Sequence, residues 1–201
     1  MGNKPKTKVV IAVPCADSAS MKALTAHSIG CTIIASEGLV TGFSLRISCD
    51  IVSNRTWLVN EAIKKGGTHI LFVDCDMVFP ESALKQLLSH GKEIVGVQYN
   101  KREFPVKAVY EPLDEKSETE LYKAKHTGMG LMLIDLSIFK TLGLPKEEGG
   151  RPTPWFNFGR DSQGALAMGE DVWFSNVARD AGFDTWIDPT IKVGHSGEFI
   201  Y

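Results

Sequence analysis

The sequence lacks the features of membrane and secreted proteins. No apolar run approaches the roughly 18 residues of a membrane-spanning helix, and the opening residues, MGNKPKTK, lack the apolar stretch of a signal peptide. Cysteine is scarce, with four residues in 201, and no two of them form a C-x-x-C pair. We therefore expect buried free thiols in a cytoplasmic protein, rather than a disulfide framework or a zinc site.

The sequence also lacks an excess of charge of either sign. Lys and Arg number 22 and Asp and Glu number 24, so the net charge of −2 provides no overall basic field for nucleic acid or anionic lipid. Hydrophobic residues make up 43% and charged residues 23%, as in globular proteins. A chain of this length buries roughly 70% of its unfolded surface, so we expect one domain that needs no structural metal.

Short apolar runs alternate with amphipathic segments through the first half of the chain. We expect strands at 9–15, 31–36, 68–73 and 93–99, and helices at 21–30, 53–65 and 80–91. Gly38 and Gly42 predict a loop after the second strand, and Ser53 or Asn54 would cap the helix that follows. This alternation predicts an α/β fold whose sheet is parallel over its first half.

The second half of the chain is less regular. Polar residues 100–127 predict short strands or a loop, followed by a strand at 130–135 and a short helix at 136–142. Residues 145–168 are rich in glycine and proline and predict a long loop, which we expect to act as a lid. A helix from Glu170 to Ala181 precedes strands at 183–188 and 191–195.

Two acids follow the most apolar of these strands. Asp74 and Asp76 come directly after HILFV, and the carboxyl ends of parallel strands line the ligand crevice of such sheets. Carboxylate oxygens are ligands that suit Mg²⁺ or Mn²⁺ carrying phosphate oxygens. The alternative is a solvated strand end whose acids only cap the next turn.

Further candidates lie in the second half of the chain. Glu170 and Asp171 open a helix, where a carboxylate could act as a general base for a hydroxyl or simply favour the helix dipole. His195 follows a late strand in KVGHSG and is either a third metal ligand or a surface histidine.

Three other residues carry weaker signals. Arg55 has the wrong sign for a helix start, so an anionic partner such as a diphosphate would explain it, and a plain surface arginine is the alternative. Trp155 could form a stacking wall for a sugar ring or anchor its loop in the core. Gly130 allows close backbone approach, either to a ligand or in a tight turn.

These segments together resemble a GT-A-type glycosyltransferase, similar to the family-2-like enzymes of bacteria and phages. The resemblance lies in HILFVDCDM, VGVQYNKR, GMGLMLIDLSIF, GEDVWFSNVARDAGF and WIDPTIKVGH, and it covers residues 8–197. It implies a three-layer α/β/α sandwich with a mostly parallel sheet, in the cytoplasm of a bacterial or phage-infected cell. Residues 8–100 would form a nucleotide-binding half and residues 101–201 an acceptor half of one domain.

The resemblance also implies a role for each candidate. Such enzymes move a sugar from a nucleoside-diphosphate sugar, with a bias to UDP, to an acceptor hydroxyl with the help of Mn²⁺ or Mg²⁺. By position, Asp74 matches the acid on the nucleotide side and Asp76 and His195 match the metal ligands, with Asp74 contributing to that site. Asp171 matches the base, whose presence implies inversion, and Glu170 the acid that orients the acceptor. The donor site would also include Pro14, Arg55, Gly130 and Trp155.

Other readings stay open from the residues alone. D-C-D-M-V also fits the start of haloacid-dehalogenase-type phosphohydrolases, in which Asp74 would be the nucleophile. A nucleotidyltransferase and a sugar-binding module without catalysis are further alternatives. The acceptor could be a glycan, a protein or a hydroxylated DNA base, although the near-neutral charge disfavours DNA. The sequence does not predict an oligomeric state.

Overall fold

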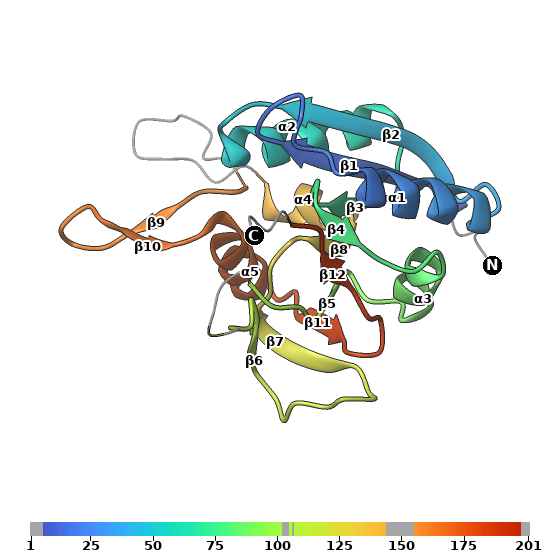
Figure 1. Ribbon diagram of the computed structural model, residues 1–201. Helices are drawn as coiled ribbons and strands as arrows, with labels where there is room; N and C mark the ends of the chain where they lie inside the picture. The colour runs from blue at the N-terminus through green and yellow to red at the C-terminus, as the bar shows by residue number, and fades with distance from the viewer. Residues whose placement is uncertain (1–5, 102–104, 106, 144–154, 198–201) are drawn as a thin grey trace.

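The computed structural model describes residues 6–101, 105, 107–143 and 155–197. Within these residues the chain forms an eight-stranded sheet in the order β2-β1-β3-β8-β5-β11-β7-β6, together with five α-helices (Figure 1). The strands of the sheet are β1 (Val9–Cys15), β2 (Val40–Ile47), β3 (His69–Val73), β5 (Ile94–Val97), β6 (Glu111–Pro112), β7 (Tyr122–His126), β8 (Leu131–Asp135) and β11 (Thr185–Asp188). The helices are α1 (Ala23–Ala35), α2 (Ile51–Lys64), α3 (Ala83–Ser89), α4 (Ser137–Leu142) and α5 (Glu170–Asp180).

Most strands of the central sheet share one direction. Strand β1 is parallel to β2 and β3, and β5 is parallel to β11. Strand β8 lies between β3 and β5 and is antiparallel to both, so β3 and β5 point the same way. The carboxyl ends of β1, β3, β5 and β11 therefore lie along one edge of a mostly parallel sheet, as the alternating pattern predicts.

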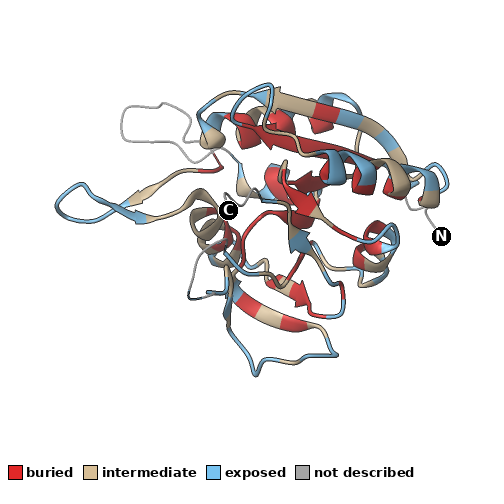
Figure 2. Cartoon of the chain, viewed as in Figure 1, coloured by how far each residue is buried: buried red, intermediate tan, exposed pale blue. Residues whose placement is uncertain are grey.

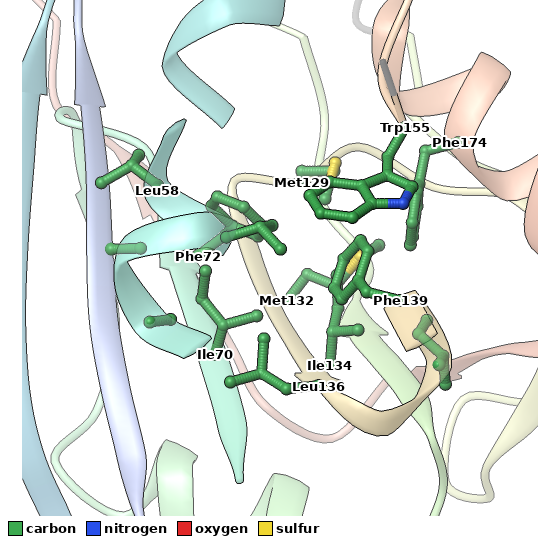
Figure 3. Packing of buried hydrophobic residues seen from close by; sticks show 14 of the residues in the cluster. Leu58, Ile70, Phe72, Met129, Met132, Ile134, Leu136, Phe139, Trp155 and Phe174 are labelled. Atoms are coloured by element: carbon green, nitrogen blue, oxygen red, sulfur yellow. The ribbon is translucent and has the colours of Figure 1, made fainter. Parts of the chain in front are cut away.

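Two hydrophobic clusters cover the two faces of this sheet. Along β1, Val10 and Ala12 belong to one cluster, while Val9, Ile11 and Val13 belong to the other, as the two-residue period of a strand requires. Helices α2, α4 and α5 contribute to the first cluster, which Figure 3 shows, and α1 and α3 contribute to the second. The result is the three-layer α/β/α arrangement that was expected.

The strand expected at 31–36 is wrong. Helix α1 continues through this segment to Ala35, past Gly30, which therefore does not end the helix. Thr32 is buried against the sheet, whereas Ile34 is 82% exposed, so the apolar run does not mark a strand inside the core. The true second strand is β2, where a loop was expected. Gly42 lies within this strand, and a Cβ at this position would lie 3.3 Å from the Val10 side chain.

Helix α2 begins earlier than expected, and its cap differs. The Asp50 carboxylate accepts hydrogen bonds from the backbone N–H groups of Val52 and Ser53, which makes Asp50 the N-cap. Asn54 lies inside the helix and donates its side-chain amide to the carbonyls of Cys15 and Ser48, at 3.2 and 2.8 Å. These bonds attach α2 to the carboxyl end of β1.

Within the described residues, two small sheets lie outside the central sheet, and each includes a strand from the second half of the chain. Strand β4 (Met77–Val78) pairs with β12 (Gly194–His195), and β9 (Gly159–Arg160) pairs with β10 (Leu166–Met168). The β9–β10 hairpin projects from the body of the protein, and its tip is exposed (Figures 1 and 2). It occupies the later part of the expected loop, whose residues 145–154 lie outside the described residues, so a lid role stays a prediction.

The boundaries of the remaining elements agree with expectation to within a few residues. This holds for β3, α3, β5, β8, α4 and α5. Across the described ranges, no helix has both the length and the apolar character needed to cross a membrane. The division into a nucleotide-binding half and an acceptor half stays a prediction.

Candidate active site

A buried arginine joins carboxylates from the two halves of the chain. The side chain of Arg55, on α2, is 3% exposed and donates Nη2 to Asp74 Oδ1 at 3.1 Å. Its Nε donates to Glu170 Oε1, also at 3.1 Å. Asp74 follows β3 and Glu170 is the first residue of α5, so these two bonds fix three elements to one another at the carboxyl edge of the sheet.

In this arrangement Arg55 is bonded to protein carboxylates. Its anionic partners in the structure are two protein carboxylates, and its guanidinium also lies 5.3 Å from the centre of the Phe72 ring. The Nη1 atom is buried without a hydrogen-bond partner within the described residues. A contribution of Arg55 to nucleotide-sugar binding stays a prediction.

The neighbouring carboxyl of Asp171 has a perturbed pKa. Burial raises the pKa of Asp171, and the charge of Glu170 raises it further. The hydrogen bond from the Val172 N–H and the charge of Arg55 lower this pKa, but their effect is smaller. A Cβ on Gly169 would lie 2.8 Å from Asp171 Oδ1, so a larger residue here would require the carboxylate to move. A carboxyl whose pKa is raised by burial is a candidate general base.

A tyrosine that sequence reasoning did not single out packs into the same edge. Tyr99 follows β5, and its Oη accepts a hydrogen bond of 2.8 Å from the Gly130 N–H. The Gly130 carbonyl in turn accepts one of 2.9 Å from the Asp74 N–H. Burial raises the pKa of Tyr99 and the charge of Asp74 raises it further, so the phenol is protonated at neutral pH.

The glycines before β8 make room for this tyrosine. A Cβ on Gly130 would lie 2.7 Å from Tyr99 Oη, and one on Gly128 would be closer still. The close approach expected at Gly130 is therefore made by the Tyr99 side chain. The signal for Tyr99 in the sequence was the pairing of an aromatic residue after one strand with the G-M-G segment before another.

The expected metal ligands Asp76 and His195 are brought together by a small sheet. Met77 is paired with His195 in the β4–β12 ladder, and the Ser196 N–H donates to the Asp76 carbonyl at 2.7 Å. The His195 ring packs edge-on against Tyr99, with ring centres 5.1 Å apart. The end of the described chain therefore lies beside the acidic strand end, although Asp76 and His195 are 119 positions apart in the sequence.

These residues fit a divalent cation only as a partial site. In the described part of the chain, no three His, Cys, Asp or Glu side chains are grouped closely enough to hold a metal ion. Asp74, the other expected ligand, is bonded to Arg55. A carboxylate just before β4 and an imidazole on the paired strand β12 nevertheless suit a cation such as Mg²⁺ or Mn²⁺, which takes most of its ligands from substrate phosphates and water.

The last two expected donor-site residues lie in the body of the fold. Pro14 is buried in β1 opposite Arg46 of β2, one residue before the end of the strand. Trp155 is 6% exposed, its Nε1 donates to the Gly143 carbonyl at 2.8 Å, and its ring is 5.0 Å from that of Phe139. Figure 3 shows Trp155 pointing into the core, where its ring anchors this segment, and a role in binding the sugar of the donor stays a prediction.

The fold is similar to that of two solved structures. A197 from STIV matches with a TM-score of 0.59 at 13% identity, over 96% of this chain and 86% of that chain. GalNAc-T7, a GT-A glycosyltransferase solved with UDP, GalNAc and Mn²⁺, matches with a TM-score of 0.55 at 14% identity.

The second match covers 97% of this chain, which spans 45% of the length of the GalNAc-T7 chain. No protein-family model and no curated protein matches the sequence. At these identities the similarity shows the fold, which is GT-A-like and Rossmann-like as the sequence segments implied.

Proposed function

We propose that this protein is a metal-dependent glycosyltransferase that moves a sugar from a nucleoside-diphosphate sugar, preferably a UDP-sugar, to an acceptor hydroxyl. The observation that carries the proposal is the Arg55 network, which holds Glu170 beside Asp74 and thereby brings Asp171 to the carboxyl edge of the sheet. The likeness to the fold of GalNAc-T7, which was solved with UDP and Mn²⁺, supports the same class of reaction.

In this proposal Asp171 is the base. The acceptor oxygen forms a bond to the anomeric carbon, the bond from that carbon to the diphosphate oxygen breaks, and the hydroxyl proton passes to the Asp171 carboxylate. The raised pKa of Asp171 makes it a better proton acceptor than an ordinary aspartate, and such a base contributes about 10²- to 10⁴-fold in rate. Attack from the side opposite the leaving group inverts the anomeric configuration.

Glu170 and Asp74 hold the reacting groups in place. Arg55 fixes one oxygen of each carboxylate, so neither side chain needs to lose rotamer freedom when substrate binds. We assign Glu170 to the acceptor and Asp74 to the nucleotide side of the donor. Because Asp74 Oδ1 is already bonded to Arg55, its use as a phosphohydrolase nucleophile is the less favourable alternative.

Asp76 and His195 would hold a divalent cation, Mn²⁺ or Mg²⁺, together with oxygens of the donor diphosphate. When bound, such a cation supplies Lewis-acid stabilisation of the charge on the leaving diphosphate. His195 packs against the partly buried Tyr99 ring, so its imidazole is oriented before any ligand arrives. Aspartate at position 76 is 8% exposed, so the carboxylate is partly desolvated as well.

A donor screen with matched variants tests this proposal. Nucleotide sugars are incubated with the protein and Mn²⁺, and release of nucleoside diphosphate is measured. Asp171→Asn keeps the size and the hydrogen bond to Val172 but removes proton acceptance, so transfer should fall by about 10²-fold or more while donor affinity persists. Asp180→Asn, at the exposed far end of α5, is the control.

Two results would contradict the proposal. If the wild-type protein turns over no nucleotide sugar, the proposed activity is wrong. Near-normal transfer by Asp171→Asn, or retention of the anomeric configuration in the product, removes Asp171 as the base.

A further inference from the structure

A cavity of about 490 Å³ lies beside His195 and is separate from the buried Arg55 network. Its walls come from residues 98–101 after β5, from Tyr110 and Lys116 on either side of β6, and from residues 192–195 that lead into β12. Because β5 ends at the same edge of the sheet as β3, the cavity opens on the edge that carries the proposed reaction.

The wall of this cavity is cationic. Among the described residues it contains Lys101, Lys116 and Lys192 and no aspartate or glutamate. Within the described residues, Lys101 has no ion-pair partner. Lys192 donates to the Pro189 carbonyl at 2.9 Å, and its charge helps to lower the pKa of Glu118. Three lysines around one cavity in a chain of net charge −2 concentrate positive charge at this place.

One carboxylate lies at the margin of this charge. Glu118, which is not part of the wall, is 2.6 Å from Lys116 Nζ and neutralises that lysine in part. The pair is exposed, with 42% and 64% of the two side chains accessible, so it is weak and can yield to a ligand. Within the described residues, the cavity therefore offers two lysines that form no ion pair, Lys101 and Lys192, and a third lysine whose weak ion pair a ligand can displace.

The rest of the wall suits a sugar. The rings of Tyr99 and Tyr110 supply flat apolar surface, and Gln98 and Asn100 supply amide donors and acceptors. Residues at the carboxyl ends of β1 and β3, where the donor is assigned, do not line the cavity. His195 is shared by the cavity and the proposed cation site, so a molecule in the cavity lies next to the donor diphosphate.

We propose that this cavity binds the acceptor and that the acceptor is a phosphorylated sugar, whose phosphate pairs with Lys101 and Lys192. The role of the ligand as acceptor rests on the proposed function, whereas the binding of a phosphorylated sugar in this cavity does not. The phosphate provides a dianion for the lysines, and the sugar ring contacts the tyrosines and carries the hydroxyl that receives the new sugar.

Binding to the full chain tests the proposal. Glucose 6-phosphate, glucose and inorganic phosphate are titrated into the protein by calorimetry, with UDP and Mn²⁺ titrated separately. Glucose 6-phosphate should bind more tightly than either fragment, and Lys101→Gln or Lys192→Gln should each weaken it by about fivefold or more. Lys64→Gln is the matched control, because Lys64 is 71% exposed on α2 and pairs with Glu61.

The outcomes separate this inference from the proposed function. Absence of glucose 6-phosphate binding by the wild-type protein, or equal binding by the lysine variants, overturns the inference. Loss of UDP and Mn²⁺ binding in Lys101→Gln or Lys192→Gln also overturns it, because the cavity would then hold the donor. The protein could also bind glucose 6-phosphate through these lysines and yet turn over no nucleotide sugar. That result would support the proposed binding site and contradict the proposed glycosyltransferase activity.

Discussion

Replacement of Arg55 by methionine tests the network on which the site depends. Methionine fills much of the arginine volume in an apolar environment but leaves the carboxylates of Asp74 and Glu170 without a cation. These side chains are 31% and 14% exposed, so Glu170 in particular would be left as a mostly buried and unpaired charge. We expect this charge, and not the lost side-chain packing, to dominate the loss of stability.

The magnitude follows from the burial of the two acids. Removing one partner of a buried ion pair costs about 3–5 kcal/mol, and the partial exposure of Asp74 places the cost near the lower value, about 3 kcal/mol. For a chain of this size, each kcal/mol lowers the melting temperature by about 2–4 °C, so we expect a decrease of about 6–12 °C. Arg55→Lys keeps the positive charge but loses the planar guanidinium that donates to both carboxylates, so the melting temperature should decrease less than in Arg55→Met.

Thermal unfolding followed by circular dichroism measures this effect. Arg160→Met is the control, because Arg160 is exposed on the β9–β10 hairpin and bonds only to the Gly164 carbonyl among the interactions described for it. Adding Glu170→Gln to Arg55→Met should restore part of the lost stability, since it removes the uncompensated charge. If Arg55→Met lowers stability by no more than Arg160→Met, the ion pairs do not hold the three elements together.

Three further predictions concern other parts of the molecule. Asp171→Asn should raise the melting temperature at pH 7, because burial raises the pKa of Asp171 and its ionised form therefore costs stability; the gain should disappear below about pH 4, where the wild-type carboxyl is protonated. Trp155→Ala should cost about 3–5 kcal/mol in denaturant unfolding, whereas a sugar-stacking role predicts weaker donor binding with unchanged stability. Iodoacetamide should modify Cys49, which is exposed, and spare Cys15, whose pKa burial raises to about 12; peptide mass spectrometry of the native protein distinguishes the two.

The sequence predicts elements well where local chemistry and burial agree. Strand β3 is a short apolar run that ends in acid, and α5 begins with a glycine and two acids, so both were placed within two residues. The segment 31–36 fails because its β-branched residues lie on a helix that the sheet holds in place. Ile34 is almost fully exposed there, so its hydrophobicity carries no information about the core.

The acidic residues of the candidate site could be predicted from the sequence, but the contacts that they make could not. Asp74 and Glu170 could be singled out from their positions after a strand and at a helix start. Their common partner could not, because Arg55 is 115 residues from Glu170 and the expected partner was a ligand. Tyr99 was missed for the same reason, since its importance depends on two glycines that precede a strand formed later in the chain.

The position of β8 has a consequence for how the chain reaches its folded state. A nascent chain that ends near residue 100 contains β1, β2 and β3, which can pair with one another, but β5 has no neighbour until β8 and β11 are made. Strand β8 then has to enter between two strands that precede it, so both would present open edges while synthesis continues. Completion of the central sheet is therefore a late, long-range event, and a fragment cut near residue 100 should aggregate through the edges of β3 and β5 instead of folding as a nucleotide-binding unit.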